Sequence, residues 1–327
     1  MRRAWLLLSG LVAVALIIVS CAQPAQPTAV PAKPTEAPKA AAPAPTEAPK
    51  AASAPAKNEP LPKAKEGTVL RRIQDRGKVI IGVKYDVPLF GYLNPQTNKP
   101  EGFDVAMGKE IAKRIFGVDD AGVDAKIEFK QAVSKDRIPF LQQDVADLVI
   151  STMTINADRE KEIDFSNVYY LAGQSLLVPK DSAIKSFDDL DGKKVCTAKG
   201  STSEQNLTSI AGKKGKKVEA VLFDSYSEGV TAMLNKRCDA VTTDDIILMG
   251  FASQNKDLKL VGGQFTFEPY GIGIKKGSAE MVELANSVLA ELKASGQWKA
   301  VFKREVGDKA GVDAPDLPKD NWRDIVK

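Results

Sequence analysis

KVIIGVKY, residues 78–85, is a nearly unbroken apolar run with the length of a buried strand. VLRRIQDRG (69–77) precedes it and is typical of a short helix closed by Gly77. GFDVAMGKEIAKRIFG (102–117) follows it, with apolar residues at helical spacing. A buried strand with helices before and after it along the chain indicates a parallel sheet covered by helices.

This alternation of strand and helix continues along the chain and restarts after Tyr169 and Tyr170. Two such runs in succession predict an α/β protein with two doubly wound parallel-sheet lobes. We expect further strands at 125–133, 146–152, 193–200, 218–224 and 239–244, and further helices at 135–143, from 202 onward and at 226–236.

Polar residues gather where the expected strands end, and this edge of a parallel sheet is where ligands bind. The residues are Thr152, Thr154 and Arg159 in the first run and Ser201, Thr202 and Asp244 in the second. Ser201 also begins an S-x-x-E capping pattern, so a helix start with free amides is expected there. Hydroxyls, amides and an arginine together suit an anion. The alternative is an ordinary strand exit with a solvated arginine.

The N-terminus is typical of a processing signal. Residues 1–20 combine a basic start with an apolar run that is short for a membrane span, and a small residue precedes Cys21. The pattern resembles a bacterial lipobox, so we expect cleavage before Cys21 and a lipid on its thiol; a plain secretory signal is the alternative. Residues 21–65 contain PTEAPKAA twice and are rich in alanine and proline, which predicts a disordered tether.

Composition excludes several classes of function. The chain has no histidine, so neither histidine-assisted catalysis nor a histidine-bearing metal site is available. The net charge is +4, of which the leader carries +2 and the tether +3, leaving about −1 for the folded part. A nucleic-acid binder needs its basic excess on the folded part. We expect a monomer with no metal, no cofactor and no nucleic-acid partner.

Two cysteines, Cys196 and Cys238, remain in a chain that we expect to be exported, where disulfides form. A disulfide between them is possible. However, Cys196 lies in the middle of an expected strand and Cys238 at the start of another, and this register favours two free, buried thiols.

Five segments, in this order, resemble the family 3 extracellular solute-binding proteins, which are amino-acid receptors of ABC importers. They are PEGFDVAMGKEIAKRI, STMTINADREKEIDFSNVYY, KKVCTAKGSTSEQ, CDAVTTDDIIL and PYGIGIKKGS. The resemblance covers residues 65–305, and GVKYD, Asp136–Arg137, TTDD and YGIGIKK lean toward the glutamate/aspartate-binding branch. One departure is Ala106, at a position where the family often has a second acid.

The resemblance implies two lobes joined by two crossing strands, with the ligand between them. Lobe 1 would comprise 66–170 and 271–327, and lobe 2 would comprise 174–264. The implied ligand residues are Lys84, Asp86, Arg137, Thr152, Thr154, Arg159, Ser201, Thr202, Tyr226 and Asp244.

Among these residues, Arg159 would clamp the α-carboxylate and Asp244 would take the α-ammonium group. Lys84 and Arg137 fall where receptors for acidic amino acids place cations for the side chain. If Asp86 also faces the ligand, the site carries +1, which complements glutamate, whereas glutamine would leave a buried cation unmatched.

We therefore expect a receptor that binds glutamate or aspartate and delivers it to the membrane permease of an ABC transporter. It would be lipid-anchored to the outer face of the cell membrane or lie in the periplasm. The alternatives are a receptor for glutamine or another polar amino acid, an enzyme on the same fold, and a tethered sensor. An enzyme is disfavoured because there is no histidine for acid–base chemistry.

Overall fold

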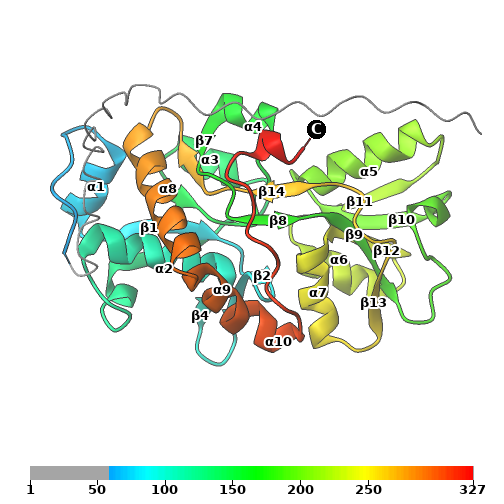
Figure 1. The fold of residues 1–327 in the computed structure, drawn as a ribbon. Coiled ribbons are helices and arrows are strands. Elements are labelled where there is room, and N and C mark those ends of the chain that lie inside the picture. Colours follow the sequence, from blue (N-terminus) through cyan, green and yellow to red (C-terminus); the bar gives the residue numbers. More distant parts are fainter. Residues whose placement is uncertain (1–58, 327) are drawn as a thin grey trace, which may run out of the picture. The chain divides into compact units, whose positions relative to one another are not determined.

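The computed structural model describes residues 59–326, which form two α/β lobes (Figure 1). The strand order in the lobe 1 sheet is β5 (Ile127–Gln131), β1 (Val79–Val83), β6 (Leu148–Val149), β15 (Gly273–Lys275) and β7 (Ile163–Phe165). In the lobe 2 sheet it is β11 (Glu219–Phe223), β10 (Lys194–Ala198), β12 (Ala240–Asp244), β9 (Gln174–Pro179) and β13 (Leu258–Val261). The predicted two-lobed α/β fold is confirmed.

Each sheet is mixed, whereas the sequence predicted purely parallel sheets. β1 pairs in parallel with β5 and β6, and β10 pairs in parallel with β11 and β12. β15 runs antiparallel to β6 and β7, and β9 runs antiparallel to β12 and β13. β9 and β15 are the strands that enter a sheet directly after the chain crosses between lobes. They therefore begin at the edge where the parallel strands end.

The two crossing segments expected between the lobes are present, and they pair with each other. β8 (Tyr170–Ala172) and β14 (Glu268–Tyr270) form an antiparallel pair and run side by side between the two sheets (Figure 1). The Tyr170 ring lies parallel to the ring of Phe302, with centroids 5.9 Å apart. Trp298 is fully buried beside them and donates its indole N–H to the carbonyl of Tyr169 at 2.8 Å. This aromatic packing fixes the crossing strands to lobe 1.

Helices pack beside the strands, and the predicted helices are all present. Helix α1 begins after Thr68, whose hydroxyl accepts from the amide of Arg71, and ends at Gly77 in the left-handed conformation (φ 72°). The helices are α1 (Val69–Arg76), α2 (Phe103–Phe116), α3 (Arg137–Gln142), α4 (Ala157–Glu162), α5 (Thr202–Lys213), α6 (Tyr226–Leu234), α7 (Asp245–Gln254), α8 (Ala279–Ala294), α9 (Gln297–Phe302) and α10 (Asp308–Ala310).

A small three-stranded sheet follows β1 and was not predicted from the sequence. It consists of β2 (Asp86–Val87), β3 (Gly91–Asn94) and β4 (Lys99–Glu101). These strands are too short, and too rich in turn residues, to show an alternating pattern.

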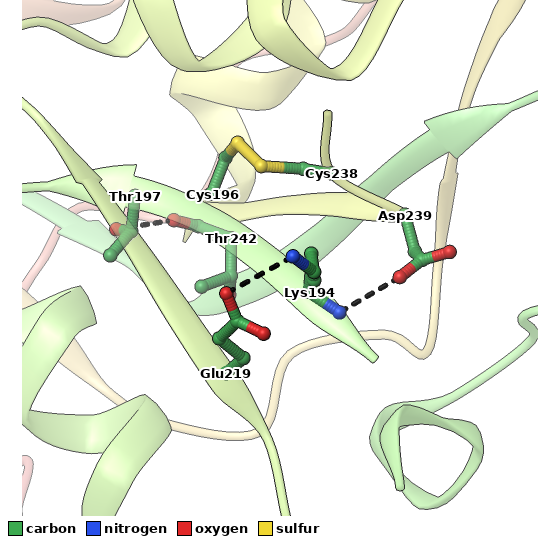
Figure 2. The surroundings of a disulfide bond; sticks show 7 residues. All are labelled: Lys194, Cys196, Thr197, Glu219, Cys238, Asp239 and Thr242. Atoms are coloured by element: carbon green, nitrogen blue, oxygen red, sulfur yellow. Dashed lines mark hydrogen bonds and ion pairs between the residues drawn. A yellow bond between two sulfur atoms is a disulfide. The ribbon is translucent and has the colours of Figure 1, made fainter. Parts of the chain in front are cut away.

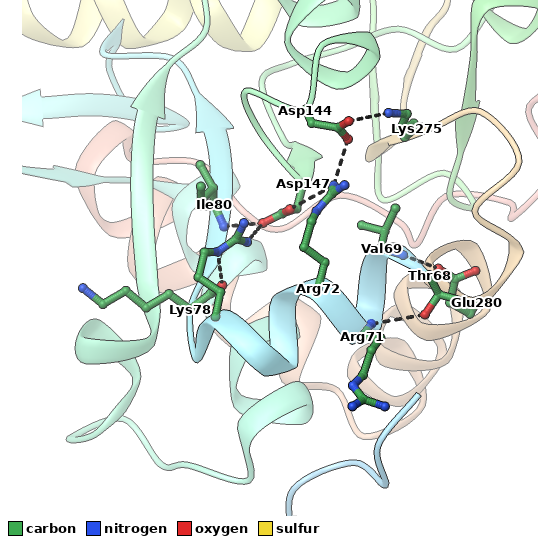
Figure 3. A network of polar contacts seen from close by, with 11 residues as sticks. Thr68, Val69, Arg71, Arg72, Lys78, Ile80, Asp144, Asp147, Lys275 and Glu280 are labelled. Atoms are coloured by element: carbon green, nitrogen blue, oxygen red, sulfur yellow. Dashed lines mark hydrogen bonds and ion pairs between the residues drawn. The ribbon is translucent and has the colours of Figure 1, made fainter. Parts of the chain in front are cut away.

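Asp147 fastens α1 to the lobe 1 sheet. Its carboxylate is 2% exposed, accepts the amide of Ile80 at 2.8 Å and forms an ion pair with Arg76. Arg72 reaches Asp147 at 3.5 Å and Asp144 at 2.8 Å, and Asp144 also pairs with Lys275 of β15 (Figure 3). The network joins helix α1, the start of β1 and the end of β15.

The end of the predicted tether belongs to the folded body. The amide of Leu61 donates to the carbonyl of Ile115 at 3.1 Å, and the side chain of Gln74 contacts Leu61, Pro62 and Ala64. Leu61 and Ala64 also pack on the core, which offsets the cost of ordering this stretch. The tether prediction was therefore wrong for this stretch. The predicted signal peptide, Cys21 and the rest of the tether lie outside the described residues.

Candidate ligand-binding site

Arg159 lies where the two lobes meet. The side chain of Asn156 caps helix α4 by accepting from the amide of Arg159 at 2.9 Å. The guanidinium is 8% exposed; it donates to the carbonyl of Thr154 at 2.7 Å and, across the lobes, to that of Gly200 at 3.4 Å. Burial, reinforced by the nearby Arg137, lowers the pKa of Arg159 to about 9. The side chain is therefore still a cation at neutral pH, held by neutral carbonyls.

Two threonines, one from each lobe, share a single carboxylate. Thr154 and Thr202 donate to Oε2 of Glu268 at 2.7 and 2.8 Å, and their own hydroxyl oxygens lie 3.3 Å apart. The other oxygen of Glu268 accepts from Asn206 and Thr266, both at 2.8 Å. Glu268 is 2% exposed and was not predicted as a site residue.

Ser201 acts as a helix cap. Its hydroxyl donates to the carbonyl of Ala198 at 2.6 Å and accepts from the amide of Glu204 at 3.2 Å. The carboxylate of Glu204 takes the amide of Gly200 at 2.9 Å, so the predicted S-x-x-E pattern forms a variant of the capping box. Thr202, the first residue of this helix, lies 3.3 Å from the hydroxyl of Thr154, so the helix start is where the lobes meet.

Arg137 donates to three carbonyls of lobe 1. It is 3% exposed; Nε donates to the carbonyl of Ser134 at 3.1 Å, and Nη1 donates to the carbonyls of Ser151 and Thr152, both at 3.0 Å. Thr152 adopts a left-handed conformation (φ 42°), and its amide donates to Asp104 at 2.8 Å. Arg137 and Asp104 therefore hold the sharp turn that ends β6, which explains why the predicted strand 146–152 stops at Val149.

Lys84, Tyr226 and Asp86 form a second group across the lobes. Lys84 is fully buried, donates to the hydroxyl of Ser134 at 2.8 Å and places Nζ 5.1 Å from the centre of the Tyr226 ring. Burial lowers the pKa of Lys84 to about 7. Asp86 accepts the amides of Tyr226 and Ser227 at 2.9 and 3.4 Å, so this lobe 1 carboxylate caps helix α6 of lobe 2.

Asp244 ends β12 with one carboxylate oxygen satisfied and the other not. Oδ2 accepts from the hydroxyl of Tyr270 at 2.5 Å, whereas Oδ1 is buried without a hydrogen-bond partner. Burial, reinforced by the charge of Glu268, raises the pKa of Asp244 well above its usual range. A buried acceptor with a free oxygen is costly and therefore suits an incoming donor.

The charges of the site do not pair with one another directly. Three buried cations, Lys84, Arg137 and Arg159, have no carboxylate of residues 59–326 within 4.0 Å. Three buried carboxylates, Asp104, Asp244 and Glu268, take hydroxyl or amide donors instead. The arrangement is formally neutral in its buried members, and it keeps cationic and anionic poles apart.

Six of the ten predicted residues make printed contacts from one lobe to the other within residues 59–326: Lys84, Asp86, Thr154, Arg159, Thr202 and Tyr226. Arg137 donates to strand-end carbonyls, and one oxygen of Asp86 caps helix α6 while its other oxygen, Oδ1, is buried without a hydrogen-bond partner. Asp104 and Glu268 were missed. Asp104 lies in the GFD motif, and Glu268 directly precedes the PYG motif. The residues next to each acid in the sequence do not indicate that it is buried.

Cys196 and Cys238 form a disulfide, with Cα atoms 5.8 Å apart (Figure 2). The preference for two free thiols was therefore wrong. Cys196 lies within β10, and Cys238 lies in the segment that leads into β12, outside the residues that pair with β10. The bond joins β10 and β12, which lead to Ser201 and Asp244.

No group of three or more acidic or cysteine side chains within residues 59–326 could hold a metal ion. Across the same residues, none of the helices is both long and apolar enough to cross a bilayer.

Comparison with known proteins gives a consistent result. Residues 79–308 match the family described as bacterial extracellular solute-binding proteins, family 3. The chain is 43% identical to the ABC transporter glutamine-binding protein GlnH of Bacillus subtilis, over 74% of this chain and 86% of that protein. It is 48% identical to a glutamine-binding protein of Geobacillus stearothermophilus, over 63% and 76% of the two chains. It is 33% identical to the glutamate-binding protein GluB of Corynebacterium glutamicum, over 75% and 84%.

Among solved structures, an ancestral arginine-binding protein bound to arginine superposes with a TM-score of 0.64 at 38% identity, covering 71% of this chain and 99% of that one. The match to the family model spans most of the chain, and its members are solute-binding receptors, which confirms a binding protein over an enzyme. The chain belongs to the bacterial extracellular solute-binding proteins of family 3.

Proposed function

We propose that the protein captures one free amino acid outside the cell membrane and delivers it to an ABC transporter permease, with glutamine as its ligand. The observation that carries the proposal is the separation of charge in the site. Arg159 has no carboxylate partner among the described residues, and Oδ1 of Asp244 has no donor. An α-carboxylate on Arg159 and an α-ammonium on Asp244 would satisfy both.

Two findings favour glutamine over the glutamate that the sequence suggested. First, the site also contains Asp104 and Glu268, and these two carboxylates change the formal charge counted for Lys84, Arg137, Arg159, Asp86 and Asp244 from +1 to −1. Glutamate would add an unmatched negative charge to this set, whereas glutamine adds none. Second, the relatives at 43% and 48% identity are named glutamine-binding proteins, and the glutamate-binding relative is 33% identical.

The group formed by Lys84, Asp86 and Tyr226 would receive the side chain of the ligand. Lys84 has one hydroxyl partner and two further ammonium protons, which suit the carbonyl oxygen of a side-chain amide. Asp86 keeps one buried oxygen, Oδ1, without a partner, and this oxygen suits the amide N–H₂. A side-chain amide offers both an acceptor and a donor, whereas an ionised carboxylate offers acceptors alone.

A thermal-shift screen with the twenty amino acids, followed by calorimetric titration of the hits, tests this function. Glutamine should raise the unfolding temperature most, because a ligand at 100 times its Kd adds about 2.7 kcal/mol of stability. Arginine and glutamate are the informative competitors. A larger shift with either would replace glutamine as the ligand, and no shift with any amino acid would overturn the receptor proposal.

Arg159→Ala tests the proposed contact between Arg159 and the α-carboxylate of the ligand. Because every amino acid has an α-carboxylate, the variant should lose glutamine, glutamate and arginine alike, by about 2–5 kcal/mol. Arg237→Ala, the removal of an exposed arginine outside the site, provides the control. If Arg159→Ala binds glutamine within about tenfold of wild type, Arg159 does not bind the α-carboxylate.

Anchoring at Cys21 is a separate proposal, supported by the sequence before that residue. Cys21→Ser should release the protein from the membrane fraction or leave the precursor uncut. Quantitative fractionation of a processed Cys21→Ser protein with membranes would contradict a lipid anchor.

A further inference from the structure

We propose that Glu268, a residue of the crossing strand β14, determines the charge preference of the ligand site and thereby selects a neutral side chain over an acidic one. This inference rests on the proposed function. It gives β14 a role in recognition in addition to its place in the hinge.

Glu268 lies on β14 close to both groups of residues proposed to bind the ligand. Side chains two residues apart on a strand point to the same face. Glu268 and Tyr270 are so placed on β14, and each contacts a different pole of the site. Glu268 accepts from Thr154, whose carbonyl binds Arg159, while Tyr270 donates to Asp244. One short strand thus contacts both the residues proposed to bind the α-carboxylate and the residue proposed to bind the α-ammonium group.

Glu268 is also a buried charge with no cation beside it. Its four donors, Thr154, Thr202, Asn206 and Thr266, are all neutral, and none of the cations within residues 59–326 comes within 4.0 Å. Hydrogen bonds from neutral groups stabilise a carboxylate but do not cancel its field. The field is strong in a buried site, where screening by water is weak.

The field of Glu268 reaches Arg159 and Asp244, the two residues proposed to bind the charged groups of the ligand. The charge of Glu268 favours the cationic form of Arg159 and raises the pKa of Asp244. A ligand between these two residues would experience the same negative field. It would disfavour an additional carboxylate in the ligand side chain and leave an amide unaffected.

Through its two threonine contacts, Glu268 also binds both lobes. Thr154 belongs to lobe 1 and Thr202 begins helix α5 of lobe 2, so both lobes meet on one carboxylate oxygen. A purely structural role for Glu268 would therefore be to hold the lobes together. Such a role predicts equal losses for all ligands, which separates it from a role in selecting charge.

The test measures the ratio of glutamine to glutamate affinity by calorimetry in wild type and three variants. Glu268→Gln and Glu268→Met remove the charge with different side chains, and Glu268→Asp keeps the charge with a shorter one. In both neutral variants we expect the ratio to move toward glutamate by about tenfold or more. In Glu268→Asp we expect the wild-type ratio within about threefold, even if both affinities fall.

Glu219→Gln, the same charge change on an exposed strand of lobe 2, is the matched control and should leave the ratio unchanged. Equal loss of both ligands in the neutral variants would overturn the inference and leave the proposed function intact. If wild type binds neither ligand, the proposed function fails, and the inference fails with it. Two neutral variants keep the test decisive if one of them does not fold.

Discussion

The two lobes present strand ends to the same site but hold them by different means. In lobe 1, the buried charges of Arg137 and Asp104 fix the turn after β6 through the carbonyls and amide of Thr152 and its neighbours. In lobe 2, Thr197 donates to the carbonyl of Thr242 and Thr242 donates to that of Ser175, both at 2.8 Å, and a disulfide joins the same strands.

This difference predicts which change destabilises each lobe. Lobe 1 builds its part of the site with ionised groups that are costly to bury and cannot be removed singly without leaving other groups unsatisfied. Lobe 2 holds its strands with neutral hydroxyls and a covalent bond, and Asp244 ends one of these strands. We therefore expect lobe 1 to respond to the loss of a charge and lobe 2 to reduction.

Removal of Arg137 should give the largest loss of stability. Arg137→Ala leaves three buried carbonyls without their donor, and we expect a loss of about 3–5 kcal/mol in the free energy of unfolding, measured by denaturant titration.

The same variant tests the sequence-based role of Arg137 as a cation for an acidic side chain. If it holds the turn, glutamine and glutamate affinities should fall together. A selective loss of glutamate in Arg137→Ala would restore the earlier role and break the contrast between the lobes.

Removal of the disulfide should give the next largest loss. The bond closes a loop with a sequence separation of 42 residues, for which chain entropy gives a contribution of about 4 kcal/mol. Cys196→Ala/Cys238→Ala should unfold at correspondingly lower denaturant concentration. Reductant should destabilise wild type in the same way and leave the double variant unchanged. Equal sensitivity of both proteins to reductant would argue against the bond.

Asp244→Asn should give a smaller effect of the opposite sign. The raised pKa of Asp244 means that the folded state binds a proton more tightly than the unfolded state, whose value is near 3.8. Ionised Asp244 therefore destabilises the ligand-free protein as pH rises above about 4.

At pH 7, Asp244→Asn should consequently raise the unfolding temperature by a few degrees, about 1–2 kcal/mol, while it weakens ligand binding strongly. The gain in stability should vanish toward pH 4. Destabilisation of the ligand-free variant at pH 7 would show that the carboxylate is a structural group.

The sequence predicted the parts of the fold that have a local pattern. The strand 78–85, the helix 102–117 and the cap at Gly77 were all visible in residue periodicity and appear as β1, α2 and the end of α1. The antiparallel strands β9 and β15 were not among the predicted strands, and their direction depends on the crossing between the lobes and not on local residues.

The site was predictable for residues at strand ends, such as Arg159 and Asp244, since topology alone gathers them. Whether a charge is free or committed was not predictable. Arg137 resembles Arg159 as the buried arginine of a six-residue helix, and only the carbonyls around each one separate them. Glu268 follows an exposed phenylalanine, Phe267, and nothing beside it in the chain signals burial.

The proposed site recognises both charged groups of a free amino acid. Calorimetric titration of wild type with glutamine and with two analogues, one whose α-carboxylate is an amide and one whose α-amine is acetylated, tests this. We predict one glutamine per chain and a loss of about 100-fold or more for each analogue, because each leaves one buried pole unmatched. Binding of either analogue within about tenfold of glutamine would contradict the account.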